Sequence, residues 1–342
     1  MLTNAQLAEL LARAAEENEG HRQRALRSAS RAAYHWPEEV ADIVERGDSL
    51  RDLPKIGGWL SGIIRRWLED PPEVPDPPPI RAGFRTFAEA LAIVADNPEW
   101  SSGLRGDLQM HTEYSDGKES IVAMAGEGAE RGYEYIAITD HSKGLRIAGG
   151  MHEEELLAQI DEIDVVNEEL RKAGHDIRVL RALEMNINPQ GEGDMEPESL
   201  EPLDLVLGSF HSSLRTKDDQ TDRYLAAVRN PHFQILGHPR GRKYDNRLGL
   251  QADWPRVFEE ATKHDKAIEI NSFPDRQDLN SELLEIAREA GVRVSIGTDA
   301  HDRMEMRFIP MGVAAAIKAG IDRERVINYM SVDDLVAWAK GH

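Results

Sequence analysis

Side chains that could bind metal ions recur at regular places in the second two thirds of this chain. Seven short apolar stretches after residue 100 each end at or near a side chain of the ligand type. These side chains are His111, His141, Glu184, His211, His238, Asn271 and the pair Asp299 and His301. A single histidine at a strand end is usually an ordinary polar residue. Seven such strand ends in succession indicate one polar cluster at one end of a barrel.

The residue types predict a site for more than one divalent ion. Asp116 lies in a Ser-Asp-Gly turn that could fold its carboxylate back toward His111, and Glu184 could bridge two ions. Asp299 and His301 are two apart and share one side of an extended segment. The mixture of imidazoles and carboxylates suits manganese, zinc or iron better than magnesium or calcium. We expect two or three ions, manganese first, because paired ions activate water and clamp both oxygens of a phosphate ester.

The sequence predicts alternating strands and helices as the elements that position these residues. The strands are expected at 108–111, 135–139, 177–184, 203–210, 233–237, 267–271 and 293–297. Helical periodicity separates most of them, as in 154–173 and 281–290. Seven such units without hairpin signals predict a parallel barrel close to the (β/α)8 type, with the active residues in the loops that follow the strands.

The chain divides at a proline-rich stretch. Residues 70–79 read DPPEVPDPPP, which favours an extended, semi-rigid spacer. We expect a wholly helical domain at 1–70, this linker plus one helix near 85–95 within 71–100, and the metal-binding domain at 101–342.

Composition limits the cellular context. The chain has no cysteine, which excludes disulfides and thiolate metal sites, and shows neither a signal segment nor a membrane span. A cytoplasmic protein without a membrane partner is therefore expected. The net charge of -21 argues against nucleic-acid binding through a generally basic surface, although bound ions would create a local positive field.

The motifs resemble the PHP (polymerase and histidinol phosphatase) family, most closely the PHP domain that ends bacterial family X DNA polymerases. The segments that carry the resemblance are 106–112 (GDLQMHT), 115–117 (SDG), 139–142 (TDHS), Glu184, 211–212 (HS), 237–242 (GHPRGR), 269–276 (EINSFPDR) and 298–301 (TDAH). The resemblance implies a distorted (β/α)7 barrel, up to three metal ions and phosphoester hydrolysis. In those polymerases it implies 3′–5′ exonuclease activity or related processing of DNA 3′ ends, usually with manganese.

The resemblance also implies a ligand set and catalytic roles. The implied metal ligands are Gln109, His111, Asp116, His141, Glu184, His211, His238, Asp299 and His301. Glu184, His211 and Asp140 are the expected catalytic residues, with Asp140 and Asp107 orienting imidazoles. Gln109 departs from the family, which commonly has His-x-His here; an amide oxygen is a weaker ligand, so one ion could bind loosely.

Cationic residues after the strands are candidates for phosphate binding. Lys143, Arg240, Arg242 and Arg276 follow strand ends, and arginine suits bidentate phosphate contacts. The strand that ends at Asn271 is expected to support substrate through nearby Arg276. The alternative for each cation is a surface salt bridge in an acidic protein.

The first 70 residues carry a second resemblance. The segments 53–57 (LPKIG) and 61–64 (SGII) are similar to the helix-hairpin-helix of the small DNA-binding domain of family X polymerases. Such a hairpin presents backbone N–H groups to a DNA phosphate, and the candidate contacts are Arg24, Lys55 and Gly57. Lys55 stands where the family usually has glycine. The alternative is a plain helical turn with a glycine cap.

Three functional hypotheses remain open on sequence alone. The first is a nuclease or phosphodiesterase for DNA 3′ ends, and the second is a phosphatase for a small monoester such as a histidinol-phosphate-like compound or a nucleotide. The third is a DNA-binding module with a weakened site. We expect no polymerase activity, because residues 71–100 leave no room for a polymerase core between the two resembling regions. The sequence does not indicate an oligomeric state.

Overall fold

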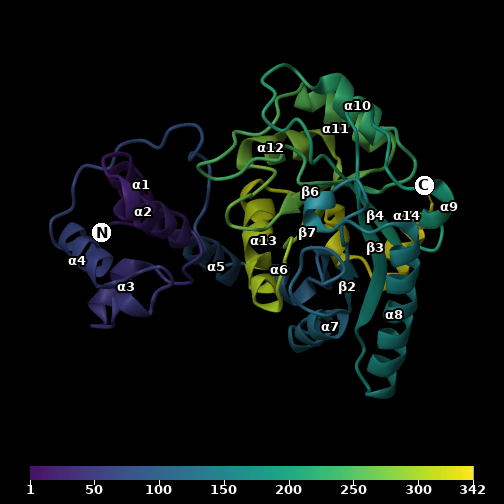
Figure 1. The fold of residues 1–342 in the computed structure, drawn as a ribbon, viewed down its shortest axis with the longest axis horizontal. Coiled ribbons are helices and arrows are strands. Elements are labelled where there is room, and N and C mark those ends of the chain that lie inside the picture. Colours follow the sequence, from purple (N-terminus) through teal and green to yellow (C-terminus); the bar gives the residue numbers. More distant parts are fainter. Residues whose placement is uncertain (342) are drawn as a thin grey trace.

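The computed structural model describes residues 1–341 and consists of a small helical domain beside a larger barrel (Figure 1). His342, the last residue of the predicted metal-binding domain, lies outside the described residues. None of the helices in the described part combines the length and apolar character that crossing a bilayer requires.

Seven parallel strands form one sheet in which each strand pairs with the next along the chain. The strands are β1 Gly106–Met110, β2 Tyr135–Ile138, β3 Arg178–Asn186, β4 Leu205–Ser209, β5 Ile235–Gly237, β6 Ala267–Asn271 and β7 Arg293–Gly297. All seven predicted strands are confirmed, and so is the distorted (β/α)7 barrel. Their almost continuous burial is typical of a parallel sheet covered on both faces.

Residues just beyond the strand ends close the barrel. The N–H of Asp299 donates to the carbonyl of Gln109 at 2.9 Å, and the N–H of His111 donates to the carbonyl of Ala300 at 2.8 Å. These bonds join the end of β1 to the segment that follows β7. Closure therefore takes place among the candidate ligands themselves.

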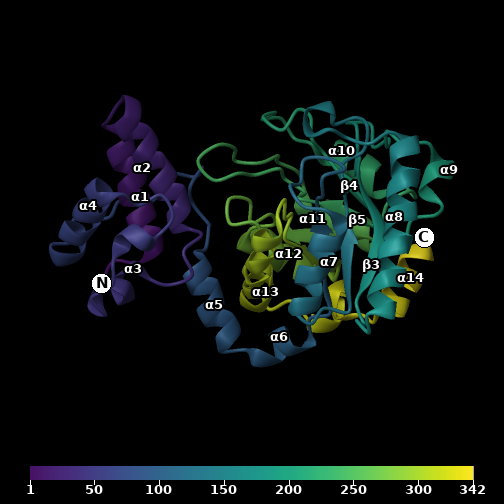
Figure 2. The ribbon, with the colours of Figure 1, turned by 60° about the horizontal axis from the view of Figure 1, so that its bottom comes forward.

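Helices surround the barrel and plug one of its ends (Figure 2). They are α7 Ile121–Glu130, α8 Glu153–Lys172, α9 Pro197–Leu200, α10 Thr221–Val228, α11 Trp254–Lys263, α12 Ser281–Ala290, α13 Ile309–Lys318 and α14 Val332–Lys340. Short 3-10 turns lie at Leu50–Asp52, Arg146–Ala148, Arg303–Phe308, Arg323–Arg325 and Ile327–Tyr329. Leu335 and Ala339 of α14 pack against Leu108, Leu180 and Leu205 at the amino-terminal ends of the strands. That end is apolar and closed, which leaves polar chemistry to the carboxyl ends.

The helical domain contains α1 Asn4–Glu16, α2 Gly20–Ala33, α3 Val40–Glu45 and α4 Gly58–Glu69. The proline-rich stretch after α4 has no regular structure, as expected. The predicted helix at 85–95 is present as α5 Phe87–Ala95, and a second short helix, α6 Pro98–Gly103, follows it.

The helical domain is fastened to the loop that follows β5. Tyr244 of this loop is buried in the apolar core of the helical domain, and its hydroxyl lies 3.0 Å from Oγ of Ser30 on α2. Buried Arg81 of the linker pairs with Glu9 at 2.9 Å and with Asp245 at 3.1 Å. The two domains therefore meet at the end of the barrel that carries the candidate ligands.

Candidate metal centre

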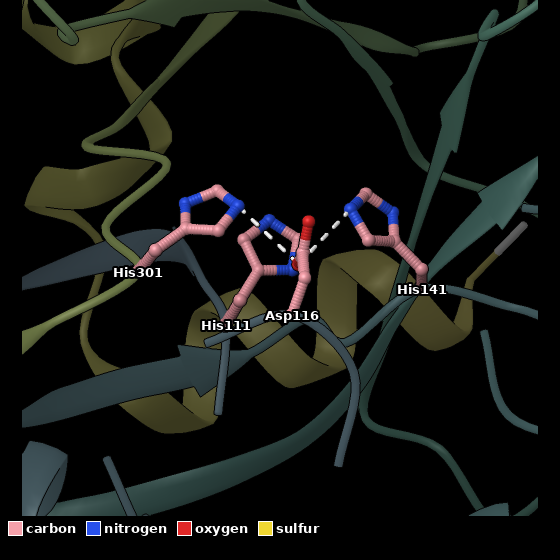
Figure 3. A group of neighbouring side chains, drawn as sticks. All are labelled: His111, Asp116, His141 and His301. Atoms are coloured by element: carbon pink, nitrogen blue, oxygen red, sulfur yellow. Dashed lines mark ion pairs between the residues drawn. The ribbon is translucent and has the colours of Figure 1, made fainter. Parts of the chain in front are cut away.

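The structure brings the eight predicted histidine and carboxylate ligands to one end of the barrel. They lie at or just after the carboxyl ends of β1, β2, β3, β4, β5 and β7. Figure 3 shows four of them, His111, Asp116, His141 and His301, with the Asp116 carboxylate between the imidazoles. Two groups are tight enough to hold an ion: these four residues, and His141 with Glu184 and His211.

Glu184 is the centre of the cluster. Its carboxylate is fully buried and lies 2.8 Å from Nε2 of His238, 3.0 Å from Nδ1 of His141 and 3.4 Å from Nε2 of His211. Burial alone would raise the pKa of Glu184, but the surrounding imidazoles outweigh it and hold that pKa well below its usual range. An ionised carboxylate among imidazoles can bridge ions on both sides.

Asp116 organises the second group. Its carboxylate lies 3.3 Å from Nε2 of His301 and 3.5 Å from Nε2 of His141. Burial opposes ionisation, but the contact with His301 lowers the pKa of Asp116 overall. The same contact outweighs burial at His301 and raises the pKa of that imidazole to about 9. By contrast, burial lowers the pKa of His211 to about 4, so His211 is neutral at pH 7 and ready to act as a ligand.

Several buried ring atoms lack a hydrogen-bond partner, which fits a metal centre. They include Nδ1 of His111 and Nδ1 of His238; Nε2 of His211 and Nε2 of His238 lie near the Glu184 carboxylate but form no hydrogen bond of normal geometry with it. Leaving so many buried polar atoms unpaired is costly unless something else satisfies them. Imidazole nitrogens and carboxylate oxygens are the donors that manganese, zinc and iron accept. The residues present therefore fit more than one divalent ion.

Gln109 is placed differently from the other predicted ligands. With its amide nitrogen turned toward Glu269 of β6, it donates to that buried carboxyl group, whose Oε2 lies 3.0 Å away. Burial, followed by the nearby Asp299 carboxylate, raises the pKa of Glu269 well above its usual range. Gln109 thus has only its amide oxygen left to offer an ion. Sequence analysis missed Glu269, although its place two residues before Asn271 on a buried strand was a signal.

Within residues 1–341 the side chains of Asp140 and Asp107 hydrogen-bond to no imidazole, which corrects the role predicted for them. Asp140 accepts hydrogen bonds from Thr112, Ser115 and Gln159, and so anchors the loop that carries Asp116. Asp107 accepts from the N–H and hydroxyl of Thr298, just before Asp299. Burial raises the pKa of Asp107 to about 6. Both carboxylates fix loop backbone beside the ligands.

One of the four predicted phosphate-binding cations lies in the cluster. Arg276 pairs through Nε with Oδ2 of Asp299 at 2.8 Å, and Asn271 donates to the same oxygen at 3.1 Å. Asp299 also lies 3.1 Å from Nε2 of His111. Asn271 and Arg276 therefore hold the same oxygen of Asp299, and this contact links the strand end at Asn271 to the candidate metal ligands.

The other three cations are engaged elsewhere. Lys143 pairs with Glu153 at 2.5 Å, and Arg240 donates to the carbonyls of Leu248 and Leu250. Arg242 donates to carbonyls of the linker at residues 82 and 83 and stacks on Phe84, with 3.8 Å to the ring centroid. This geometry does not favour their predicted phosphate contacts. Arg242 instead fastens the linker to the barrel.

The candidate DNA contacts lie on the surface of the helical domain. Lys55 and Gly57 are exposed in the turn before α4, where Gly57 is the N-cap residue. Lys55 has a φ of 67°, in the left-handed region that glycine occupies most easily. Arg24 is exposed on α2.

A parallel barrel with clustered imidazoles and carboxylates at its carboxyl end is typical of metal-dependent hydrolases. A sequence profile of the PHP domain matches residues 107–273. A probable phosphatase of Caldanaerobacter subterraneus subsp. tengcongensis is 31% identical over 225 residues, covering 63% of this chain and 82% of that protein. The chain belongs to the PHP family and is a phosphoester hydrolase.

Other relatives differ in how much of their length the chain covers. DNA polymerase/3′-5′ exonuclease PolX of Bacillus subtilis is 36% identical over 268 residues, which is 77% of this chain but only 45% of that protein. The chain thus spans less than half the length of this relative. Among solved structures, a histidinol phosphate phosphatase of Lactococcus lactis with zinc, L-histidinol and phosphate aligns at a TM-score of 0.45 and 18% identity, covering 64% of this chain and 95% of that one.

Proposed function

We propose that the protein is a metal-dependent phosphodiesterase that processes the 3′ ends of DNA, most simply as a 3′–5′ exonuclease. The observation that carries this proposal is the position of the helical domain against the metal-centre end of the barrel. Arg31 and His35, on and just after α2, both lie 3.3 Å from Asp275, the neighbour of Arg276. Arg276 in turn contacts the candidate ligand Asp299. A DNA strand held by the helical domain would have its end near the metal centre.

The chain's own residues have distinct parts in this chemistry. Glu184, held ionised and fully buried, is the carboxylate that bridges the two ligand groups, and neutral His211 lies beside it. Arg276 presents a fixed positive charge beside Asp299 for the phosphate that enters. Two or three divalent ions, manganese first and zinc or iron as alternatives, would supply activated water and neutralise charge on the phosphate.

A small phosphomonoester is the second candidate substrate. Relatives named as probable phosphatases, including one of Escherichia coli K12 that is 28% identical, favour it. The net charge of -21 favours it as well, because an acidic surface repels a polyanion. A third possibility, a DNA-binding module with a weakened site, depends on Gln109 as a poor ligand.

One assay separates these candidates. The full chain is incubated with manganese and either 5′-labelled DNA or a panel of small monophosphates, histidinol phosphate and nucleotides among them. We expect stepwise shortening of the DNA from its 3′ end and slower turnover of the monoesters. Turnover of monoesters without shortening of DNA would overturn the proposal in favour of a phosphatase. Binding of DNA without turnover of either substrate would favour the third candidate.

A further inference from the structure

Two cations that sequence analysis did not single out lie beside Arg276. Lys243 and Arg247 face each other across a tight turn in the loop after β5: the N–H of Lys243 donates to the carbonyl of Arg247 at 3.0 Å, and the reverse bond is 2.9 Å. Both side chains lie close enough to Arg276 to feel its charge. We call Lys243, Arg247 and Arg276 the cation cluster. It borders the metal centre, because Arg276 contacts Asp299.

The charges of Lys243 and Arg247 are poorly compensated. Among residues 1–341, neither side chain forms an ion pair, and Nε of Arg247 is buried without a hydrogen-bond partner. Burial, reinforced by Arg276, lowers the pKa of both groups, while Asp275 only partly offsets this for Lys243. A protein with a net charge of -21 has many carboxylates that could have paired with them. An anion that enters would relieve the repulsion among these crowded, half-buried cations.

A row of arginines on α2 extends this positive region away from the metal centre. Arg24, Arg27 and Arg31 are exposed and follow the spacing i, i+3 and i+7, which places them along one face of the helix. Arg31 lies close enough to Lys243 to lower the pKa of that lysine. We call these three residues the α2 arginine row. At a rise of about 1.5 Å per residue, the row extends about 10 Å beyond Arg31.

The path of the backbone brings the loop that carries Lys243 and Arg247 close to α2. In Figure 2 the loop between β5 and α11 reaches from the barrel toward α1 and α2. The bond between Ser30 of α2 and Tyr244 fixes that approach, since the two residues adjoin Arg31 and Lys243. The α2 arginine row and the cation cluster therefore adjoin at Arg31 and Lys243.

We propose that the cation cluster and the α2 arginine row form a track for the phosphodiester backbone of a DNA strand whose end lies in the metal centre. The proposal rests on the function proposed above and deepens it, because a monoester would reach only Arg276. At a charge spacing of about 3.4 Å per strand, the row alone spans about three phosphates. The track explains how an acidic protein can hold a polyanion.

Salt dependence of binding tests the track directly. Binding of a 5′-labelled 12-nucleotide single strand by the full chain as purified is followed by fluorescence anisotropy at several salt concentrations. Lys243→Gln with Arg247→Gln, and separately Arg24→Gln with Arg27→Gln, each remove two phosphate contacts. Each pair should reduce the slope of log K against log salt by about 1.4. Because Arg24 and Arg27 are exposed, the second pair is expected to fold normally.

A matched control removes two charges from the opposite end of the barrel. Lys318 and Lys340 are exposed and end α13 and α14, and α14 plugs the amino-terminal ends of the strands. Lys318→Gln with Lys340→Gln should leave the slope as in the wild-type protein. Turnover gives a second measure: kcat/KM of the track variants should fall at least tenfold more on the oligonucleotide than on bis(p-nitrophenyl) phosphate.

The outcomes separate the track from the proposed function. If the wild-type protein shortens DNA but both track pairs keep the slope of the control pair, the track is wrong and the function stands. If the wild-type protein hydrolyses only small phosphate esters and does not bind the oligonucleotide, the DNA function fails and the track fails with it. Reduced slopes for both pairs, with an unchanged control, support the track.

Discussion

Replacing Asp140 with asparagine should weaken one metal position more than the other. Oδ1 of Asp140 accepts from the N–H of Thr112 at 2.8 Å and from Ser115, while Oδ2 accepts from the hydroxyl of Thr112 at 2.6 Å and from Gln159 at 2.7 Å. These bonds anchor the loop that leads to Asp116. In the described residues the side chain of Asp140 makes no hydrogen bond to Glu184 or to any imidazole. Its backbone carbonyl accepts from the N–H of Glu184 at 3.1 Å, and asparagine keeps that bond.

The magnitude follows from the bonds that asparagine cannot keep. Its amide nitrogen would face Gln159 Nε2 or the Thr112 N–H, and donors do not pair with donors. One or two bonds to a charged acceptor are lost, each contributing about 1.5–3 kcal/mol. Mutating a residue that positions metal ligands typically lowers metal affinity by about 10–100-fold. We therefore expect Asp140→Asn to lower manganese affinity by about 10–100-fold at the candidate position formed by His111, Asp116, His141 and His301.

Calorimetric titration of the metal-free protein with manganese measures this directly. Asp140→Asn should weaken one class of site by about 10–100-fold, while the site that includes Glu184 and His211 changes much less. Ser115→Ala removes only one of the four donors and is the control, with a smaller loss at the same site. Equal weakening of both classes, or no change in either, would refute the assignment of Asp140 as an anchor of one position.

Three further changes test other parts of the structure. Gln109→His supplies the imidazole that the family commonly has and should add about one metal ion per chain by elemental analysis. The control Gln109→Asn should add none. An unchanged metal content in Gln109→His would show that Glu269 blocks that position. Lys55→Asn removes the positive charge but places at this position a residue that tolerates a φ of 67°. The slope of log K for DNA binding against log salt should therefore fall by about 0.7–0.9, with little change in Tm. An unchanged slope would exclude Lys55 from the DNA contacts. Arg81→Met leaves buried Glu9 with Arg13, 2.8 Å away, as its remaining cation, and should lower the free energy of unfolding by at most about 3–5 kcal/mol. Adding Glu9→Gln should restore part of this loss, and additive losses in urea unfolding would contradict a coupled pair.

The barrel and the clustering of the candidate ligands could be predicted from the sequence because both depend on local signals. Each apolar strand runs directly into its ligand, as at His211 and His238, so parallel order alone brings the ligands together. The same reasoning located Arg276, because it follows β6 by a few residues.

What the sequence could not predict depends on contacts between distant segments. The role of Arg242 is decided by carbonyls of the linker about 160 residues away. The partners of Asp140 come from two other elements, so the expectation of an imidazole partner was wrong. Lys243 differs from the other cations in that its side chain forms no ion pair among residues 1–341, and a missing ion pair has no sequence signal.

The central claim is that the clustered histidines and carboxylates form the catalytic metal centre. It is tested most directly by manganese-dependent hydrolysis of 3′-labelled DNA, compared between the wild-type protein and His238→Ala. Nε2 of His238 lies 2.8 Å from Glu184. We predict that the variant keeps its circular dichroism spectrum but hydrolyses DNA no faster than the wild-type protein stripped of metal. Full activity of a folded His238→Ala variant would contradict the account.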